Sequence, residues 1–220
     1  MLFRSKSAEG HLLRADAWSQ ERDSDKAIAD YNAAIELDPL DAGAYGRRAR
    51  AWNTKKELDR AIADSTEALR LNPNDPYAHL QRAYAWSQKR EDDKAVADYT
   101  AAIEIDPHEA SAYDGRARIW NRKKDYDKAI ADCTALIRVD PRRASAYTLR
   151  AWAWSQKREY DKAIEDINEA IRLHPKNPDY YYCRAKTWEW KGDGARADAD
   201  FRKCVELDPS YGPRLIDRRR

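Results

Sequence analysis

Apolar and polar positions alternate along the chain with a helical spacing that itself recurs every 34 residues. Within one period, Tyr113, Ala117 and Trp120 are separated by four and three residues, which places them on one face of a helix. The tryptophans that mark successive periods are Trp18, Trp52, Trp86, Trp120, Trp154 and Trp188. The pattern therefore predicts one amphipathic helix at the start of each period.

A second helix is predicted in the same period, after a polar turn over 123–125. It carries Ala129, Cys133 and Leu136 on its inner face and ends before Pro141, because proline cannot continue a helix. Equivalent prolines close the other periods, at Pro39, Pro73, Pro107, Pro175 and Pro209. Each period is thus expected to form an antiparallel helix pair, since a fixed period of this size indicates a stacked helical repeat.

The repeats set the expected domain organisation. A short polar leader over 1–7 precedes the array, and a basic tail over 212–220 follows it. The six expected repeats are 8–41, 42–75, 76–109, 110–143, 144–177 and 178–211. Such an array forms one elongated unit, because each repeat contacts only its neighbours.

The repeat resembles the tetratricopeptide repeat (TPR) family, whose pattern is Trp-x2-Leu-Gly-x2-Tyr, then Ala-x3-Phe, then Pro. In this chain the sequence Tyr113-x2-Arg116-Ala117-x2-Trp120 exchanges the two aromatic positions and replaces Leu with Arg and Gly with Ala. The resemblance covers 8–211. It implies an all-α fold, a right-handed superhelical solenoid of antiparallel helix pairs, and a non-catalytic protein-protein interaction scaffold.

One arginine and one aspartate recur in every repeat and need a partner, because long charged side chains are rarely buried unpaired. Antiparallel packing places Arg116 in the same layer as Asp132, so we predict Arg–Asp pairs along the array. The alternative pairs each aspartate with a cation four residues earlier, as in Lys128–Asp132. The predicted pairs are Arg14–Asp30, Arg48–Asp64, Arg82–Asp98, Arg116–Asp132, Arg150–Asp166 and Arg184–Asp200.

Charge and targeting signals limit the classes of partner and the cellular location that we expect. The 41 basic residues nearly balance the 39 acidic ones, which gives a net charge of +2 and no overall attraction to nucleic acid or to an anionic membrane. The first residues contain no apolar run of the kind found in signal peptides, and no segment approaches the ~20 apolar residues of a membrane span. We therefore expect a cytoplasmic protein that does not enter membranes.

Chemistry-bearing residues are scattered. Cys133, Cys183 and Cys204 have no metal-type or disulfide-type spacing, and Cys133 and Cys204 fall on positions expected to be buried. The four histidines lie in different repeats: His11 and His79 occupy an aromatic packing position, and His108 and His174 are expected in solvent. With no phosphate-binding loop and no nucleophile–base arrangement, we expect no enzyme activity, metal or cofactor.

The resemblance implies that repeat positions 2, 5, 9, 12 and 13 of the first helices line a concave groove that binds a partner. From these positions we expect a peptide or protein with central acidic groups and apolar anchors. Position 5 carries no lysine, so the family's clamp for a C-terminal carboxylate is not expected. The alternative is that Trp152 and Trp190 only shield neighbouring helices and that the charged residues are only solvated. The groove residues expected to contact the partner are Arg50, Asn53, Tyr77, Tyr84, Ser87, Arg118, Asn121, Arg122, Trp152, Ser155, Tyr182, Lys186 and Trp190.

Two other functions stay open at this point. One is a nucleic-acid-associated adaptor that uses the basic groove centre and the tail over 218–220. The other is a regulatory module that acts with a separate enzyme.

The last repeat differs from the earlier ones, because Asp198 stands where they carry Ile or Val, which predicts a last helix with a polar face. Leu215 and Ile216 could fold back over it, or the exposed end of the array could bind another copy.

Overall fold

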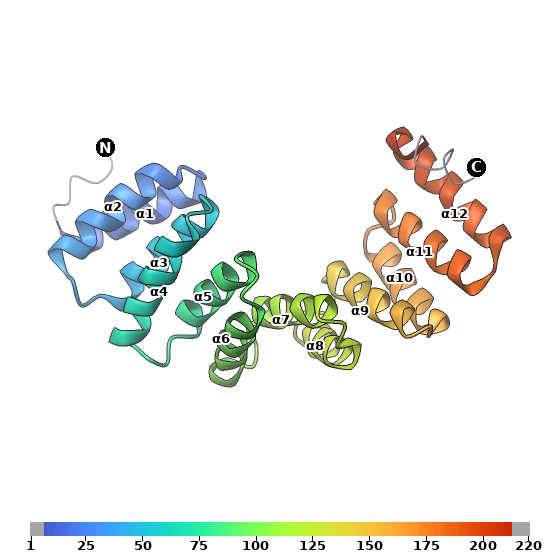
Figure 1. Cartoon of the computed structure of the whole chain (residues 1–220). Coiled ribbons are helices and arrows are strands. Elements are labelled where there is room, and N and C mark those ends of the chain that lie inside the picture. The colour runs from blue at the N-terminus through green and yellow to red at the C-terminus, as the bar shows by residue number, and fades with distance from the viewer. Residues whose placement is uncertain (1–6, 213–220) are drawn as a thin grey trace. The chain divides into compact units, whose positions relative to one another are not determined.

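The computed structural model describes residues 7–212, which form twelve α-helices, one short 3-10 helix and no β-strand (Figure 1). The chain divides into two compact units between Arg116 and Ala117, and each unit is described by itself. The helices are α1 (Ala8–Gln20), α2 (Ser24–Leu37), α3 (Ala42–Thr54), α4 (Leu58–Leu71), α5 (Pro76–Gln88), α6 (Asp92–Ile105), α7 (Ala110–Arg122), α8 (Tyr126–Val139), α9 (Ala144–Gln156), α10 (Tyr160–Leu173), α11 (Pro178–Lys191), α12 (Gly194–Leu207) and the 3-10 helix η1 (Pro209–Tyr211).

The helices pack as successive pairs within each unit. In the first unit α1 packs on α2, α3 on α4, and α5 on α6; in the second, α9 packs on α10 and α11 on α12. The second helix of one pair then contacts the first helix of the next, as α2 does with α3 and α10 with α11. The predicted all-α class, a solenoid built from antiparallel helix pairs, is confirmed.

Helix boundaries follow the turn chemistry of the sequence. Pro76 and Pro178 occupy the first turn of α5 and α11, and the side chains of Asp75 and Asn177 accept hydrogen bonds from backbone N–H groups there. The turn inside each pair contains one residue with positive φ, and this residue is glycine only at Gly192. The others are Arg22, Lys56, Arg90, Lys124 and Arg158.

Alanines and tryptophans form the interior of each helix pair, as predicted. Ala15, Ala27 and Tyr31 are fully buried in the first pair, and the half-buried Trp18 packs against them. The outer side of Trp18 is covered by the Lys26 ammonium, 4.4 Å from the ring centroid. Cations of the second helix cover the equivalent tryptophans at Trp52, Trp86, Trp120, Trp154 and Trp188.

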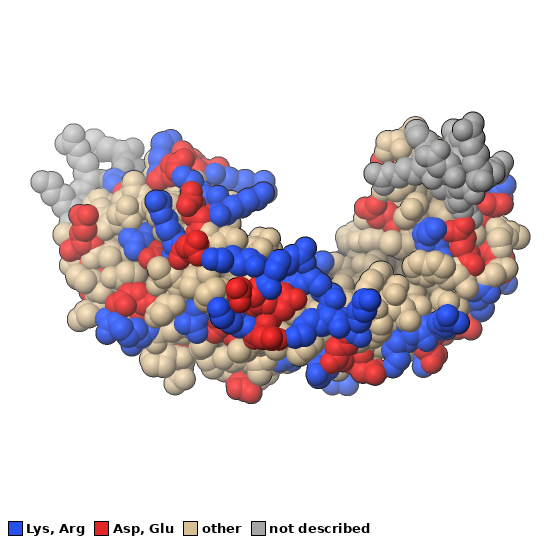
Figure 2. Space-filling view, viewed as in Figure 1, with Lys and Arg blue, Asp and Glu red and all other residues tan. Residues whose placement is uncertain are grey.

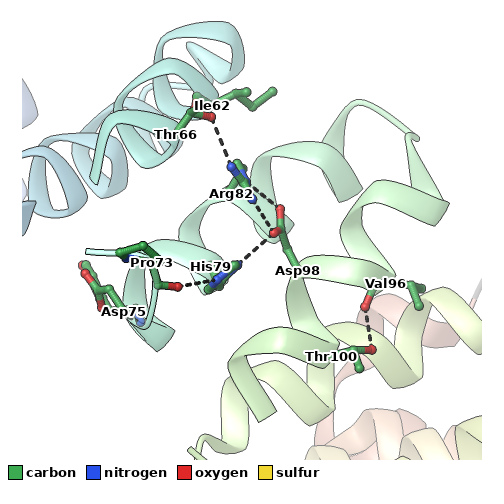
Figure 3. A network of polar contacts seen from close by, with 10 residues as sticks. Ile62, Thr66, Pro73, Asp75, His79, Arg82, Val96, Asp98 and Thr100 are labelled. Atoms are coloured by element: carbon green, nitrogen blue, oxygen red, sulfur yellow. Dashed lines mark hydrogen bonds and ion pairs between the residues drawn. The ribbon is translucent and has the colours of Figure 1, made fainter. Parts of the chain in front are cut away.

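The predicted Arg–Asp pairs are present and partly buried. Arg82 donates from Nε and Nη2 to the two carboxylate oxygens of Asp98, each over 2.8 Å (Figure 3). The same arrangement joins Arg14 to Asp30, Arg48 to Asp64, Arg150 to Asp166 and Arg184 to Asp200. These five pairs confirm the prediction for their repeats, and Arg116–Asp132 stays a prediction.

The alternative pairing of these aspartates with nearby lysines is not what the structure shows in the first repeat. Lys26 Nζ contacts Asp23 at 2.8 Å, while Asp30 accepts from Arg14. Lys128 likewise contacts Asp125 at 2.7 Å. The lysines therefore neutralise the carboxylates that cap their own helices, which leaves the inner aspartates to arginine.

Two sets of bonds between neighbouring repeats were not predicted. First, the arginine of a pair also donates to a polar residue on the second helix of the preceding repeat, as Arg82 does to Thr66 over 3.3 Å (Figure 3). The other such bonds are Arg48–Asn32, Arg116–Thr100, Arg150–Thr134 and Arg184–Asn168. Second, a turn lysine contacts an aspartate in the preceding repeat, in the pairs Lys55–Asp25, Lys89–Asp59, Lys157–Asp127 and Lys191–Asp161.

The histidine predictions need one correction. His108 and His174 are exposed, as expected. His11 and His79 do occupy a partly buried position, but they also make polar contacts. Nδ1 of His11 lies 3.0 Å from Asp30, and Nδ1 of His79 lies 2.9 Å from Asp98. A ring nitrogen thus takes part in the polar network that the arginine organises (Figure 3).

The last helix pair differs from the others in the expected way. Asp198 is exposed on α12, where earlier repeats place an apolar side chain. The ring of Tyr211 in η1 packs against Tyr182, with centroids 5.7 Å apart, and its hydroxyl donates to Asp179. Residues 1–6 of the predicted leader over 1–7, Leu215 and Ile216, and residues 213–220 of the predicted basic tail lie outside the described residues.

Candidate functional site

Among residues 7–212, each unit has a pocket along its first helices. The pocket of the first unit has a volume of about 480 Å³ and is formed by α1, α3 and the start of α5. We call it the arginine pocket. Most of its lining residues are charged or polar: Asp16, Gln20, Gly43, Arg47, Arg50 and Tyr77.

The arginine pocket contains a fixed polar network. The Tyr31 hydroxyl donates to Asp16 Oδ1 and Arg47 Nη1 donates to Asp16 Oδ2, each over 2.7 Å. Arg50 Nη2 donates to the Ser19 hydroxyl over 2.8 Å. Burial, together with the hydrogen bond to Asp16, raises the pKa of Tyr31, so its hydroxyl remains protonated and holds this donor role.

The pocket of the second unit is smaller and apolar, with a volume of about 280 Å³. We call it the aromatic pocket. It lies between α9 and α11 and also touches Ile167 of α10. Its lining residues are Thr148, Ala151, Trp152, Ser155, Ile167, Tyr182, Cys183, Lys186, Thr187 and Trp190.

Large aromatic side chains form the walls of the aromatic pocket while remaining open to solvent. Trp152 is 42% exposed and Trp190 is 46% exposed. Edge-to-face contacts hold two of the walls: Trp152 lies 5.6 Å from Tyr126, and Tyr182 lies 5.7 Å from Phe201, measured between ring centroids. Such contacts limit the freedom of the side chains, so these two walls of the pocket are held in place.

Cys183 gives the aromatic pocket a thiol. Although the residue as a whole is exposed, desolvation of the sulfur by its surroundings raises the pKa of this thiol. The neutral thiol therefore predominates at pH 7 and adds to the apolar lining. Cys133 and Cys204 are fully buried, as predicted.

Most of the groove residues expected from the sequence lie at these pockets. Arg50 and Tyr77 line the arginine pocket. The aromatic pocket brings together Trp152, Ser155, Tyr182, Lys186 and Trp190. Tyr84 is exposed and Ser87 half-buried on α5 of the first unit, and Arg118 and Arg122 are exposed on the part of α7 in the second unit; none of these four lines a pocket described here.

Two expected contact residues are buried and bonded between repeats. Asn53 is only 6% exposed, and its amide donates to the backbone oxygen of Gln81 over 3.0 Å. Asn121 is 5% exposed and donates to the backbone oxygen of Leu149 over 3.2 Å. Both amides connect one repeat to the next. Ser155 is also only 6% exposed. Contact of these three residues with a partner stays a prediction.

Arg47 is a pocket residue that sequence reasoning missed. It occupies repeat position 6, which is outside the groove positions that the family resemblance implies. Its side chain nevertheless reaches Asp16 on the preceding first helix. Arg47 lies near Asp16 because of the angle between neighbouring repeats, and that angle cannot be predicted from the spacing of residues in the sequence.

Other kinds of site have no support in the described part of the chain. Across residues 7–212, no helix combines the length and apolar character needed to cross a membrane. Over the same residues, no cluster of His, Cys, Asp and Glu has the arrangement of a metal site. In Figure 2, Lys and Arg are interleaved with Asp and Glu over much of the surface in view.

Comparison with known proteins identifies the family. The family model described as tetratricopeptide repeat matches residues 12–76, 66–110, 93–137 and 116–178. The matches together cover well over half of the chain, so the protein belongs to the tetratricopeptide repeat family. This family consists of helical arrays that serve as protein-interaction scaffolds and are typically non-catalytic.

Solved structures agree on the fold. The chain is 17% identical to YrrB, described as a TPR protein with an unusual peptide-binding site, with a TM-score of 0.73 over 86% of this chain and 98% of that one. It is 15% identical to pilF of Pseudomonas aeruginosa, with a TM-score of 0.80 over 92% of both chains. A tetratricopeptide repeat protein from Parabacteroides merdae is 21% identical, with a TM-score of 0.75 over 92% of this chain and 80% of that one. No curated protein matches the sequence.

Proposed function

We propose that the protein is a non-catalytic scaffold that binds a peptide segment of a partner protein along its first helices, with the aromatic pocket as the anchor site. The observation that carries this proposal is the pair of half-exposed tryptophans, Trp152 and Trp190, at one apolar pocket. Tryptophan and tyrosine are among the residue types enriched at interaction hot spots.

The size of the aromatic pocket supports a peptide side chain as the ligand. Its volume of about 280 Å³ is below the ~300–1,000 Å³ of sites for drug-sized molecules. One large apolar side chain, such as Leu, Met or Phe, would fill much of this space. Burying such a side chain fully contributes ~1.5–3 kcal/mol, which is enough for one anchor within a longer peptide contact.

The charge of the pocket also favours an apolar anchor. Lys186 is the cation of the lining, and its Nζ contacts Glu189 at 2.9 Å in the same helix. An internal ion pair reduces the field that a charged ligand would feel. YrrB, a TPR protein with an unusual peptide-binding site, is a precedent for peptide binding on this fold. The near balance of 41 basic and 39 acidic residues gives no support to a nucleic-acid adaptor.

Selection from a displayed library of random peptides tests the proposal, because it needs no knowledge of the natural partner. We expect the wild-type chain to enrich peptides that share one large apolar residue. Trp190→Ala should weaken capture of those peptides at least tenfold, since truncation of a hot-spot residue costs ~2 kcal/mol or more. Leu40→Ala is the matched control, because Leu40 is 73% exposed and does not line the pocket.

Cys183 provides an independent readout of occupancy. Cys133 and Cys204 are fully buried, so a maleimide should label the folded chain at Cys183 alone. A selected peptide that fills the aromatic pocket should slow this labelling. The proposal fails if no peptide is enriched, if Trp190→Ala captures the selected peptides as well as wild type, or if bound peptide leaves the labelling rate unchanged.

A further inference from the structure

We infer that the arginine pocket of the first unit is a second subsite, which binds one carboxylate side chain, Asp or Glu, of a bound peptide. The inference rests on the proposed function, since it assumes that the first helices bind peptides. It assigns to this pocket a ligand chemistry opposite to that of the aromatic pocket. Its basis is the charge and the uneven use of hydrogen-bond donors among Asp16, Arg47, Arg50 and Tyr77.

The pocket has one cation more than it can neutralise itself. Asp16 accepts from Tyr31 on one oxygen and from Arg47 on the other, so its charge is balanced by Arg47. Arg50 then remains as the cation without a carboxylate, since its described partner is the neutral hydroxyl of Ser19. The lining residues therefore carry one net positive charge, from two arginines and one aspartate.

Arg50 and Tyr77 line the pocket from two different helices, α3 and α5. A guanidinium has five N–H donors, and the described contacts of Arg50 use one of them. The Tyr77 hydroxyl, which comes from α5, has no hydrogen-bond partner among the described residues. Burial raises the pKa of Tyr77, which keeps this hydroxyl protonated. A carboxylate in the pocket could accept from the Arg50 fork and from Tyr77 together.

The fixed aspartate explains why a single carboxylate fits better than a phosphate. A phosphate group carries up to two negative charges, and here it would approach Asp16, whose Arg47 partner is already engaged at 2.7 Å. A carboxylate carries one charge, which Arg50 alone can balance in bidentate geometry. The pocket is therefore matched to an acidic side chain.

The simpler interpretation is that Arg50 only ties α3 to α1 through Ser19. Both interpretations predict some loss of stability when Arg50 is changed, so stability cannot decide between them. Binding can, because only a carboxylate subsite makes capture depend on the charge of the ligand.

Immobilised peptide arrays provide the test. The probes are peptides with one large apolar residue fixed, random neighbours, and Glu, Gln or phosphoserine at each further position in turn. We expect the wild-type chain to prefer Glu over Gln about tenfold, because a charge-assisted pair replaces a neutral hydrogen bond. The preference should shrink as salt is raised from 50 to 500 mM, since the pocket is open to solvent.

Three variants sharpen the test. Arg50→Gln should abolish the preference for Glu and retain capture through the aromatic pocket. Arg22→Gln removes the same charge from an exposed turn of the same unit and should change nothing. Asp16→Asn releases Arg47 as a second cation and should strengthen capture of Glu peptides several-fold, which a damaged fold could not do.

The outcomes separate the two proposals. If the wild-type chain captures no peptide, the proposed function is wrong. Capture with equal affinity for Glu and Gln, or a Glu preference that survives Arg50→Gln, overturns the carboxylate subsite alone. Stronger capture of phosphoserine than of Glu would also overturn it, because the pocket would then accept a dianion.

Discussion

The buried Arg–Asp pair of the third repeat offers a direct test of how the array is held together. Asp98 accepts two hydrogen bonds from Arg82 over 2.8 Å and lies 2.9 Å from His79 (Figure 3). We predict that Asp98→Asn leaves the Arg82 guanidinium without its counter-ion in a partly desolvated position. Thr66 is its other described acceptor and is neutral.

The expected cost follows from the exposure of the two side chains. Breaking a fully buried pair costs ~3–5 kcal/mol. The Asp98 side chain is 9% exposed and that of Arg82 is 23% exposed, so water can reach part of the guanidinium. Since asparagine can still accept one hydrogen bond, we expect a loss of ~2–3 kcal/mol in the free energy of unfolding.

Local stability is the quantity to measure, because repeat arrays can unfold in parts. Hydrogen exchange of the amides in α5 and α6 reports the free energy of opening of this repeat, and urea unfolding followed by helical ellipticity reports the whole chain. Asp59→Asn is the matched control: its carboxylate contacts Lys89 between repeats but is 86% exposed, so the change should cost under ~1 kcal/mol.

Two results decide the matter. A cost below ~0.5 kcal/mol for Asp98→Asn would refute the claim that these pairs are buried enough to matter. In contrast, Arg82→Leu combined with Asp98→Ala should cost less than Asp98→Asn alone, because no unpaired charge remains and the family pattern carries Leu at the arginine position. If the double variant were the less stable one, loss of packing would outweigh loss of the ion pair.

Three further predictions concern backbone, packing and pH. Lys56→Gly should stabilise the protein by ~0.5–1 kcal/mol and Gly192→Lys should destabilise it by ~1 kcal/mol in urea unfolding, because both positions have positive φ; equal stabilities would contradict this. Gly115→Ala should cost ~1–3 kcal/mol, since a Cβ there would lie 2.3 Å from Cζ of the buried Tyr99, and a thermal midpoint equal to wild type would argue against that contact. The hydrogen bond from Arg14 lowers the pKa of Asp30. The contribution of Asp30 to stability is therefore present above its unfolded pKa of ~3.9 and is lost as pH falls through its folded pKa. Asp30→Asn should flatten the fall in stability at acid pH, and an unchanged pH dependence would exclude this role.

The sequence predicted those features that depend on contacts within one repeat. Helix limits follow from proline and from caps such as Asp75, and the layer shared by Arg82 and Asp98 follows from antiparallel packing alone. These contacts need no knowledge of the next repeat. That is why the family, the helix pairs and five of the ion pairs could be predicted from the sequence.

Features that depend on the angle between repeats were missed or misjudged. Asn53 was expected in a groove, yet the next first helix approaches closely enough to bury it against Gln81. Arg47 was overlooked, although it reaches Asp16 on the preceding helix. A period of 34 residues fixes which positions recur but leaves the rotation from one repeat to the next undetermined, and that rotation decides which side chains become buried.

The short reach of the polar bonds has a consequence for how the chain folds. The described side-chain hydrogen bonds and ion pairs join residues no more than 32 positions apart, the longest being Tyr211 with Asp179. Loops of this length close at little entropic cost, and a low contact order is associated with fast folding. Any repeat with one neighbour can then nucleate the array, and a protease that cuts a single turn should leave both flanking pieces folded.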